Sequence, residues 1–152
     1  MGRVVLGFIA GAIAVLIFHQ GIIWLLSLSS GRGVFWSMAP MQPVLPFTLR
    51  FLSRVPIPDL VNKMFWGGAW GALFPFVQGL LPGRMLWLKG LLYGWLILIV
   101  SNWLVLPLII GNPVFAGGDP LRILNGALIL GGFGLGLGLI YGLMRGQSGS
   151  DA

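Results

Sequence analysis

Four long apolar runs, separated by short stretches rich in proline, glycine and charged residues, dominate the chain. They cover residues 4–28, 60–81, 86–110 and 121–144. A transmembrane helix needs about 20 apolar residues at a rise of about 1.5 Å per residue, so each run is long enough to span a bilayer. In lipid, only a helix satisfies the backbone hydrogen bonds of a single segment. The pattern therefore predicts an all-α integral membrane four-helix bundle, with residues 1–152 forming a single transmembrane domain.

Proline and glycine mark where the runs begin and end. Pro58-Asp59 precedes the second run and supplies a helix start, because aspartate is a favoured N-cap. Pro82-Gly83 ends that run, and only a few residues separate it from the third, which predicts an antiparallel hairpin. The segment 111–120, GNPVFAGGDP, is a turn-rich loop. Four spans place both termini on the same side of the membrane.

Two stretches outside the runs have a different character. In the first loop, segment 46–55 carries apolar side chains on one face and Arg50 and Arg54 on another. Such a segment is typical of a short amphipathic helix lying on the membrane surface. The last residues, 145–152, read RGQSGSDA and are predicted to form a polar, mobile tail.

Composition also indicates that the chain lies in a lipid bilayer. Hydrophobic residues make up 57% of the 152 residues and charged residues only 8%, against about 25% charged residues in a soluble domain. The mean hydropathy is +0.97. The net charge of +6 is spread along the chain, which fits headgroup contact and not nucleic-acid binding, because the latter needs a basic patch exposed to water. The absence of cysteine excludes disulfides, thiolate metal sites and cysteine nucleophiles.

Basic residues give only a weak indication of orientation. With a cytoplasmic N-terminus, four of them lie inside: Arg3, Arg84, Lys89 and Arg145. Five lie on the other side: Arg32, Arg50, Arg54, Lys63 and Arg122. The positive-inside rule gives no majority, and we favour the N-in orientation because each inside segment is short and basic.

Small residues recur at helical spacing in all four runs. Such seams allow helices to approach closely in lipid, whereas glycine is costly in a soluble helix. We therefore expect close packing along them, either within the bundle or against another chain. The predicted packing residues are Gly7 and Gly11, Gly67 and Gly71, Gly90 and Gly94, and Gly131, Gly134, Gly138 and Gly142.

His19 and Gln20 form a polar pair inside the first run, and His19 is the only histidine. An ionisable group within a membrane span is a functional hypothesis, because burying it is expensive. One interpretation is a proton relay, a haem or metal ligand, or a pocket donor. The simpler one is a neutral imidazole that is hydrogen-bonded to Gln20, Ser101 or Asn102. Because His19 lies off the small-residue seam, we expect it to face the third span.

The remaining polar groups inside the runs are Gln78, Ser101 and Asn102. Each can form a hydrogen bond between helices, or the set can line a polar path. The three acidic residues all lie outside the interior of the spans, and no nucleophile–base pair, phosphate loop or metal cluster is evident. We therefore expect no enzymatic activity, no catalytic residue, no metal site and no cofactor. Haem or pigment binding through His19 is the one cofactor alternative.

Several short motifs resemble a group of small bacterial inner-membrane proteins. They are Phe18-His19-Gln20-Gly21, Ser37-Met38-Ala39-Pro40, Trp66-Gly67-Gly68-Ala69-Trp70-Gly71 and Leu106-Pro107-Leu108. The resemblance covers most of the chain. It implies a four-helix protein of the bacterial inner membrane and supplies no activity.

These patterns favour a non-enzymatic multi-pass membrane protein that acts through packing. It would serve as an accessory or structural subunit of a membrane complex, or form a homo-oligomer through its glycine seams. The alternative is a small transporter or channel with a polar path around His19, Gln20, Ser101 and Asn102, since transporters use helices interrupted near the midplane. Its expected partners are the lipid bilayer and other membrane subunits.

Overall fold

The computed structural model describes residues 2–29 and 59–148, and this part of the chain is helical, without strands. The prediction of an all-α chain is confirmed for these residues. The elements are α1 (Gly2–Ala14), η1 (Val15–His19), α2 (Gln20–Ser29), α3 (Asp59–Val77), α4 (Leu86–Ile97), η3 (Leu98–Val105), α5 (Leu106–Ile110), η4 (Phe115–Gly118) and α6 (Pro120–Ser148).

Three of the described helices are long and apolar enough to cross a membrane. They cover Gly2–Leu26, Leu86–Ile109 and Pro120–Gly146. The second predicted span is not among them, because α3 carries Asn62 and Lys63 in its first turns and interrupts its apolar residues with glycines. α3 also ends at Val77, not at 81 as expected, two residues after the helix-breaking Pro75.

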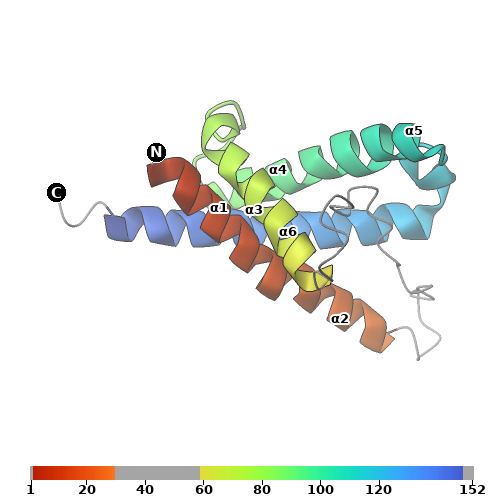
Figure 1. Ribbon diagram of the computed structural model, residues 1–152, viewed down its shortest axis with the longest axis horizontal. Helices are drawn as coiled ribbons and strands as arrows, with labels where there is room; N and C mark the ends of the chain where they lie inside the picture. Colours follow the sequence, from red (N-terminus) through yellow and green to blue (C-terminus); the bar gives the residue numbers. More distant parts are fainter. Residues whose placement is uncertain (1, 30–58, 149–152) are drawn as a thin grey trace, which may run out of the picture.

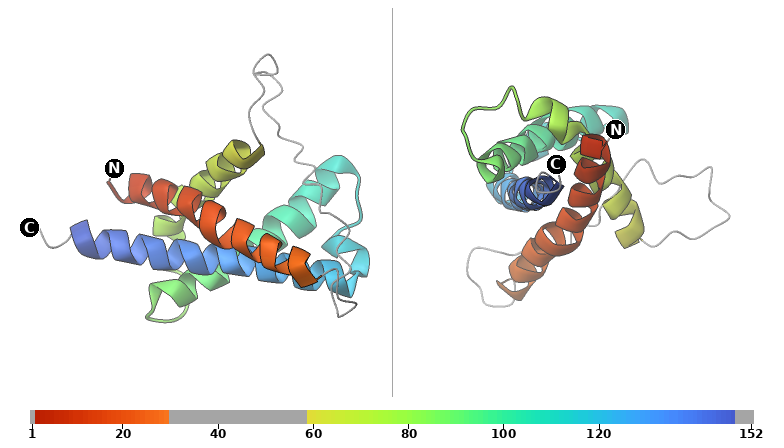
Figure 2. Two further views of the ribbon diagram at one scale, coloured as in Figure 1. Left: turned by 90° about the horizontal axis from the view of Figure 1, so that it is seen from below. Right: turned by 90° about the vertical axis from the view of Figure 1, so that its left-hand side faces the viewer.

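Helix α6 forms the axis of the molecule (Figure 1). The continuous helix α1–η1–α2 crosses α6, α4 packs along α6, and α3 packs on α1. The beginning of α1 and the end of α6 lie at the same end of the molecule, at the left of Figure 1. The left view of Figure 2 shows that α3 crosses α1 at a steep angle.

The short connection between α3 and α4 does not make these two helices pack together. Residues 78–85 connect α3 to α4, yet the two helices make only marginal contact. The extensive interfaces are between α1 and α3 and between α4 and α6. The hairpin expected from the short connection is therefore splayed: α3 pairs with the long helix before it in the sequence, and α4 pairs with the one after it.

Two of the long helices contain π-helical turns. The amide of Gln20 donates to Val15 O at the end of η1, and that of Leu106 donates to Ser101 O at the end of η3. Pro107 has no amide hydrogen, and its ring presses on the carbonyl of the fourth residue before it, so a wider turn directly upstream relieves the clash. The helix then ends at Gly111, whose φ of 73° is the left-handed conformation that glycine adopts most easily.

The core lies where α1, α3, α4 and α6 meet. Its largest fully buried side chains are Tyr141, Phe74 and Leu137. Large apolar side chains also cover the outside, including Leu80 at 85% exposure and Leu108 at 71%. Such an exterior is expected of a chain whose solvent is lipid.

The sequence predicts two segments outside the four apolar runs. The amphipathic segment 46–55 lies outside the described residues. Residues 145–148 of the predicted tail are helical, because α6 continues to Ser148, and residues 149–152 lie outside the described residues. Asp119 starts this helix: its Oδ1 accepts hydrogen bonds from the amides of Leu121, at 2.9 Å, and Arg122, at 3.4 Å.

Candidate functional site

Where α1 crosses α3, glycines leave no side chains between the two backbones. A Cβ added to Gly7 would overlap the carbonyl oxygen of Gly71, and one added to Gly11 would overlap that of Gly67. A Cβ on Gly71 would also lie 2.9 Å from the Cα of Gly11. The two backbones therefore touch, and no larger residue fits at these positions without moving a helix.

A second backbone contact joins α4 to α6. A Cβ on Gly90 would lie 2.8 Å from the Cα of Gly138, and one on Gly134 would lie 2.7 Å from the amide nitrogen of Gly94. A Cβ on Gly138 would lie 2.9 Å from the Cα of Trp87. The seam of α6 is thus filled by α4 from the same chain.

Most of the other glycines of α6 are covered by side chains. Gly131 lies under Trp95, whose Nε1 donates to Ala127 O at 3.0 Å, and Gly142 contacts Leu86. Gly136 lies under the ring of Phe18 and Gly132 under Ile22, both from the first long helix. All ten glycines predicted to mediate packing therefore contact other parts of this chain.

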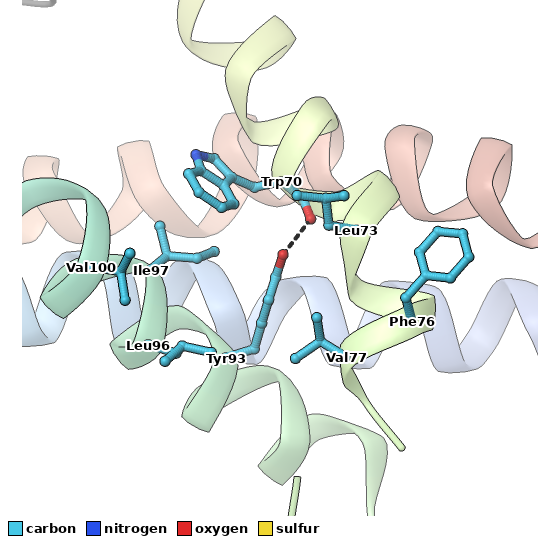
Figure 3. Close-up of a pocket in the computed structure, with 8 residues that line it drawn as sticks. All are labelled: Trp70, Leu73, Phe76, Val77, Tyr93, Leu96, Ile97 and Val100. Atoms are coloured by element: carbon cyan, nitrogen blue, oxygen red, sulfur yellow. Dashed lines mark hydrogen bonds between the residues drawn. The ribbon is translucent and has the colours of Figure 1, made fainter. Parts of the chain in front are cut away.

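Tyr93 provides the hydrogen bond that links α3 to α4. Its hydroxyl donates to Trp70 O at 2.8 Å, across the space between the two helices (Figure 3). Its ring packs against Phe74 at 5.3 Å between centroids, and Phe74 packs edge-on against Tyr141 at 5.5 Å. This aromatic cluster joins three helices in the core.

An apolar groove, with a volume of about 320 Å³, lies beside Tyr93. We call it the α3–α4 groove, and Figure 3 shows its lining side chains between the two helices. The tyrosine hydroxyl is used by Trp70, so apolar atoms form the lining. The residues are Trp70, Leu73, Phe76, Val77, Tyr93, Leu96, Ile97 and Val100.

Lys89 closes one end of the α3–α4 hairpin. Its Nζ donates to the backbone carbonyl of Gln78 at 2.9 Å, just beyond the end of α3. The side chain of Gln78 is mostly buried, and its Nε2 donates to Pro75 O at 3.3 Å. Gln78, one of the predicted polar residues, therefore forms its hydrogen bonds at the C-terminal end of α3. The Lys89 ammonium is favourable there because the carbonyls at a helix C-terminus attract a cation.

The structure does not bring His19 and Ser101–Asn102 together. His19 ends η1, which packs on α6 and α3, and the expectation that it faces the third span is wrong. Ser101 and the exposed Asn102 lie in η3, which packs on α4, α5, η4 and α6. Helices α2 and α5 diverge on either side of α6 (Figure 1). His19 and Gln20 are both half-buried.

Sequence reasoning missed three polar groups in the core. Tyr93 ties α3 to α4, while the Tyr141 hydroxyl and Asn125 Oδ1 are buried and have no hydrogen-bond partner among the described residues. A signal was present, because both tyrosines of the chain stand inside apolar runs. A tyrosine hydroxyl buried among apolar side chains usually has a hydrogen-bond partner.

Charge separates the two ends of the molecule. Arg3, Arg84, Lys89 and Arg145 lie toward the end that carries both termini and the α3–α4 connection. Within residues 2–29 and 59–148, the acidic residues are Asp59 at the start of α3 and Asp119 before the start of α6. Asp119 Oδ2 pairs with Arg122 Nε at 3.2 Å.

The described residues contain no group of three His, Asp or Glu side chains able to hold a metal ion. Comparison of the chain with protein-family models, curated proteins and solved structures found no significant match.

Proposed function

We propose that the chain is a multi-pass protein of the bacterial inner membrane and that it has no enzymatic activity. It acts through helix packing, as an accessory or structural subunit of a membrane complex or as a homo-oligomer. In this proposal α3 completes a four-helix bundle, because its contact with α1 shelters its less apolar sequence from lipid.

One observation carries the proposal: three side chains of α4 donate hydrogen bonds to backbone carbonyls of other segments of the chain. Tyr93 ties α4 to α3, Trp95 ties α4 to α6, and Lys89 ties α4 to the end of α3. None of these bonds leaves a reactive group pointing into a cavity. The apolar outer surface is what remains to interact with other molecules.

The partner surface is not formed by the glycine seams. The predicted seams are filled by α1–α3 and α4–α6 contacts within the chain. A partner helix would therefore pack on bulky exposed side chains, such as Phe76 on α3, Trp95 on α4 or Leu143 on α6. A homo-oligomer of this kind leaves each protomer's internal interfaces intact.

We propose the N-in orientation for the same chain. The end with both termini carries four basic residues and no described acidic residue. Basic residues next to membrane spans are retained in the cytoplasm.

Single-cysteine cross-linking in native membranes tests the partner proposal, because the natural chain has no cysteine. Phe76→Cys, Trp95→Cys and Leu143→Cys would be oxidised in parallel, with the cysteine-free chain as control. We expect a disulfide-linked dimer, or an adduct with a larger subunit after bifunctional cross-linking, at one of these faces. Monomer at all three positions, together with a lone monomer in mild detergent, would contradict the proposal.

Orientation has its own test. Arg84→Cys, at the proposed cytoplasmic end, and Gly111→Cys, at the other, would be exposed to a membrane-impermeant maleimide in intact spheroplasts. N-in predicts labelling of Gly111→Cys alone, and labelling of Arg84→Cys alone would reverse the orientation.

A transporter or channel is less well supported. The predicted path needs His19, Gln20, Ser101 and Asn102 around one cavity, and they lie on helices that diverge. Haem binding through His19 has no observation in its favour, and an absorption spectrum of the purified protein tests it directly.

A further inference from the structure

The α3–α4 groove opens to the outside of the molecule. Phe76 is 68% exposed, and Leu73, Leu96 and Val100 are each exposed by between 42% and 48%. The groove forms because α3 and α4 splay after their short connection, with Tyr93 closing its floor. It is therefore an apolar slot that faces the membrane from the side.

One end of this groove is cationic. Lys89 stands one helical turn before Tyr93 on α4, so it extends the row of residues that lines the groove. Its ammonium uses one of three donors on Gln78 O, which leaves two for another acceptor. Arg84 is exposed in the connection that joins the same two helices.

Apolar walls with a cationic end match one class of molecule. We propose that the α3–α4 groove binds an anionic phospholipid, with an acyl chain between α3 and α4 and the headgroup phosphate on Lys89 and Arg84. The proposal depends on the membrane location proposed above. The absence of acidic residues toward this end, within the described chain, leaves the attraction unopposed.

The size of the groove favours a lipid tail over a second copy of the chain. A helix with its side chains is about 10–12 Å across. The groove offers about 320 Å³ along the two turns of α4 between Tyr93 and Val100. A flexible acyl chain can follow this slot, whereas a helix would have to push α3 and α4 further apart.

Native mass spectrometry of the full-length protein in mild detergent tests the site. The probes are phosphatidylglycerol and phosphatidylcholine with identical acyl chains, added at equal concentration. We expect one phosphatidylglycerol to be retained preferentially. Lys89→Gln and Arg84→Gln should each weaken it by about fivefold, the effect of one charge at a lipid surface. Arg3→Gln, at the same end but on α1, is the matched control and should retain the lipid.

A second variant tests the tail site. Val100→Phe fills the groove from α4 and should reduce retention of both lipids, whereas Leu143→Phe on α6 should not. Equal retention of the two lipids, or equal loss in Arg3→Gln and Lys89→Gln, would overturn the proposal. So would a dimer that Val100→Phe converts to monomer with no change in bound lipid. A protein that forms cross-linked complexes yet retains no lipid would refute the lipid site and leave the proposed function intact.

Discussion

The α4–α6 pair and the α3–α4 pair show two different ways for helices to be neighbours. The long helix that contains α4 is joined to α6 by residues 111–119, and the backbones of α4 and α6 touch at Gly90, Gly94, Gly134 and Gly138. α3 is joined to α4 by residues 78–85, a connection of similar length, yet these two helices share a hydrogen bond from Tyr93 and a groove. The difference shows that, in this chain, small residues decide which helices pack, and connection length does not.

In the membrane location proposed above, the physical reason is the lack of a hydrophobic force between helices in lipid. Association there depends on van der Waals contact, which small residues maximise by letting backbones approach. Both faces of the groove carry bulky side chains, such as Leu73 and Leu96. These side chains hold α3 and α4 apart, and lipid solvates them as well as another helix would.

The largest loss of stability is expected when a cavity is made in the buried core. Leu137→Ala should lower the free energy of unfolding by about 2–5 kcal/mol, because Leu137 is fully buried. Leu96→Ala, which truncates a groove residue, is the control and should change it little. Reversible unfolding in mixed detergent micelles measures both. Equal losses would mean that the groove is as tightly packed as the core.

The second-largest loss of stability is expected when a single methyl group is added to the α4–α6 contact. Gly134→Ala places a Cβ at 2.7 Å from the amide nitrogen of Gly94, and overpacking of this kind costs about 1–3 kcal/mol. Gly21→Ala is the matched control, because no atom lies within 4 Å of the added Cβ. Thermal unfolding in detergent reports both variants, and a harmless Gly134→Ala would show that the helices pack less closely than described.

The smallest expected effect comes from the hydrogen bond between Tyr93 and Trp70, which spans α4 and α3. Tyr93→Phe removes the donor to Trp70 O, and such bonds average about 0.6 kcal/mol in membranes, with a maximum of about 1.7. Tyr141→Phe removes a buried hydroxyl that has no partner among the described residues, so it should be neutral or stabilising. Chemical unfolding distinguishes them, and a greater loss in Tyr141→Phe would reverse the assignment.

Much of the secondary structure could be predicted from the sequence. The third run, 86–110, coincides with α4, η3 and α5, and the first run lies within Gly2–Ser29. Apolar length and punctuation by proline and glycine suffice for such predictions, because a chain in lipid has few alternatives to a helix. They fail at the end of α3, where Pro75 lies inside the helix and the helix stops soon afterwards.

The functional residues were predicted less well. Gln78 and the glycines were identified by residue type, but their partners were not, since a small-residue stripe on one helix fits a similar stripe on any other. The expected meeting of His19 with Ser101 or Asn102 does not occur, because helical periodicity gives the direction of a side chain on its own helix and not the neighbour it meets.

The sequence by itself determined the apolar character of the chain, the helices and the positions where backbones can approach. Only the tertiary structure decided that α1 packs with α3 and α4 with α6, that α3 and α4 splay, and that Lys89 stands at the end of an apolar groove. The first set of properties depends on local composition and backbone hydrogen bonding. The second depends on which of several complementary glycine surfaces meet, and that choice is made by the packing of the whole chain.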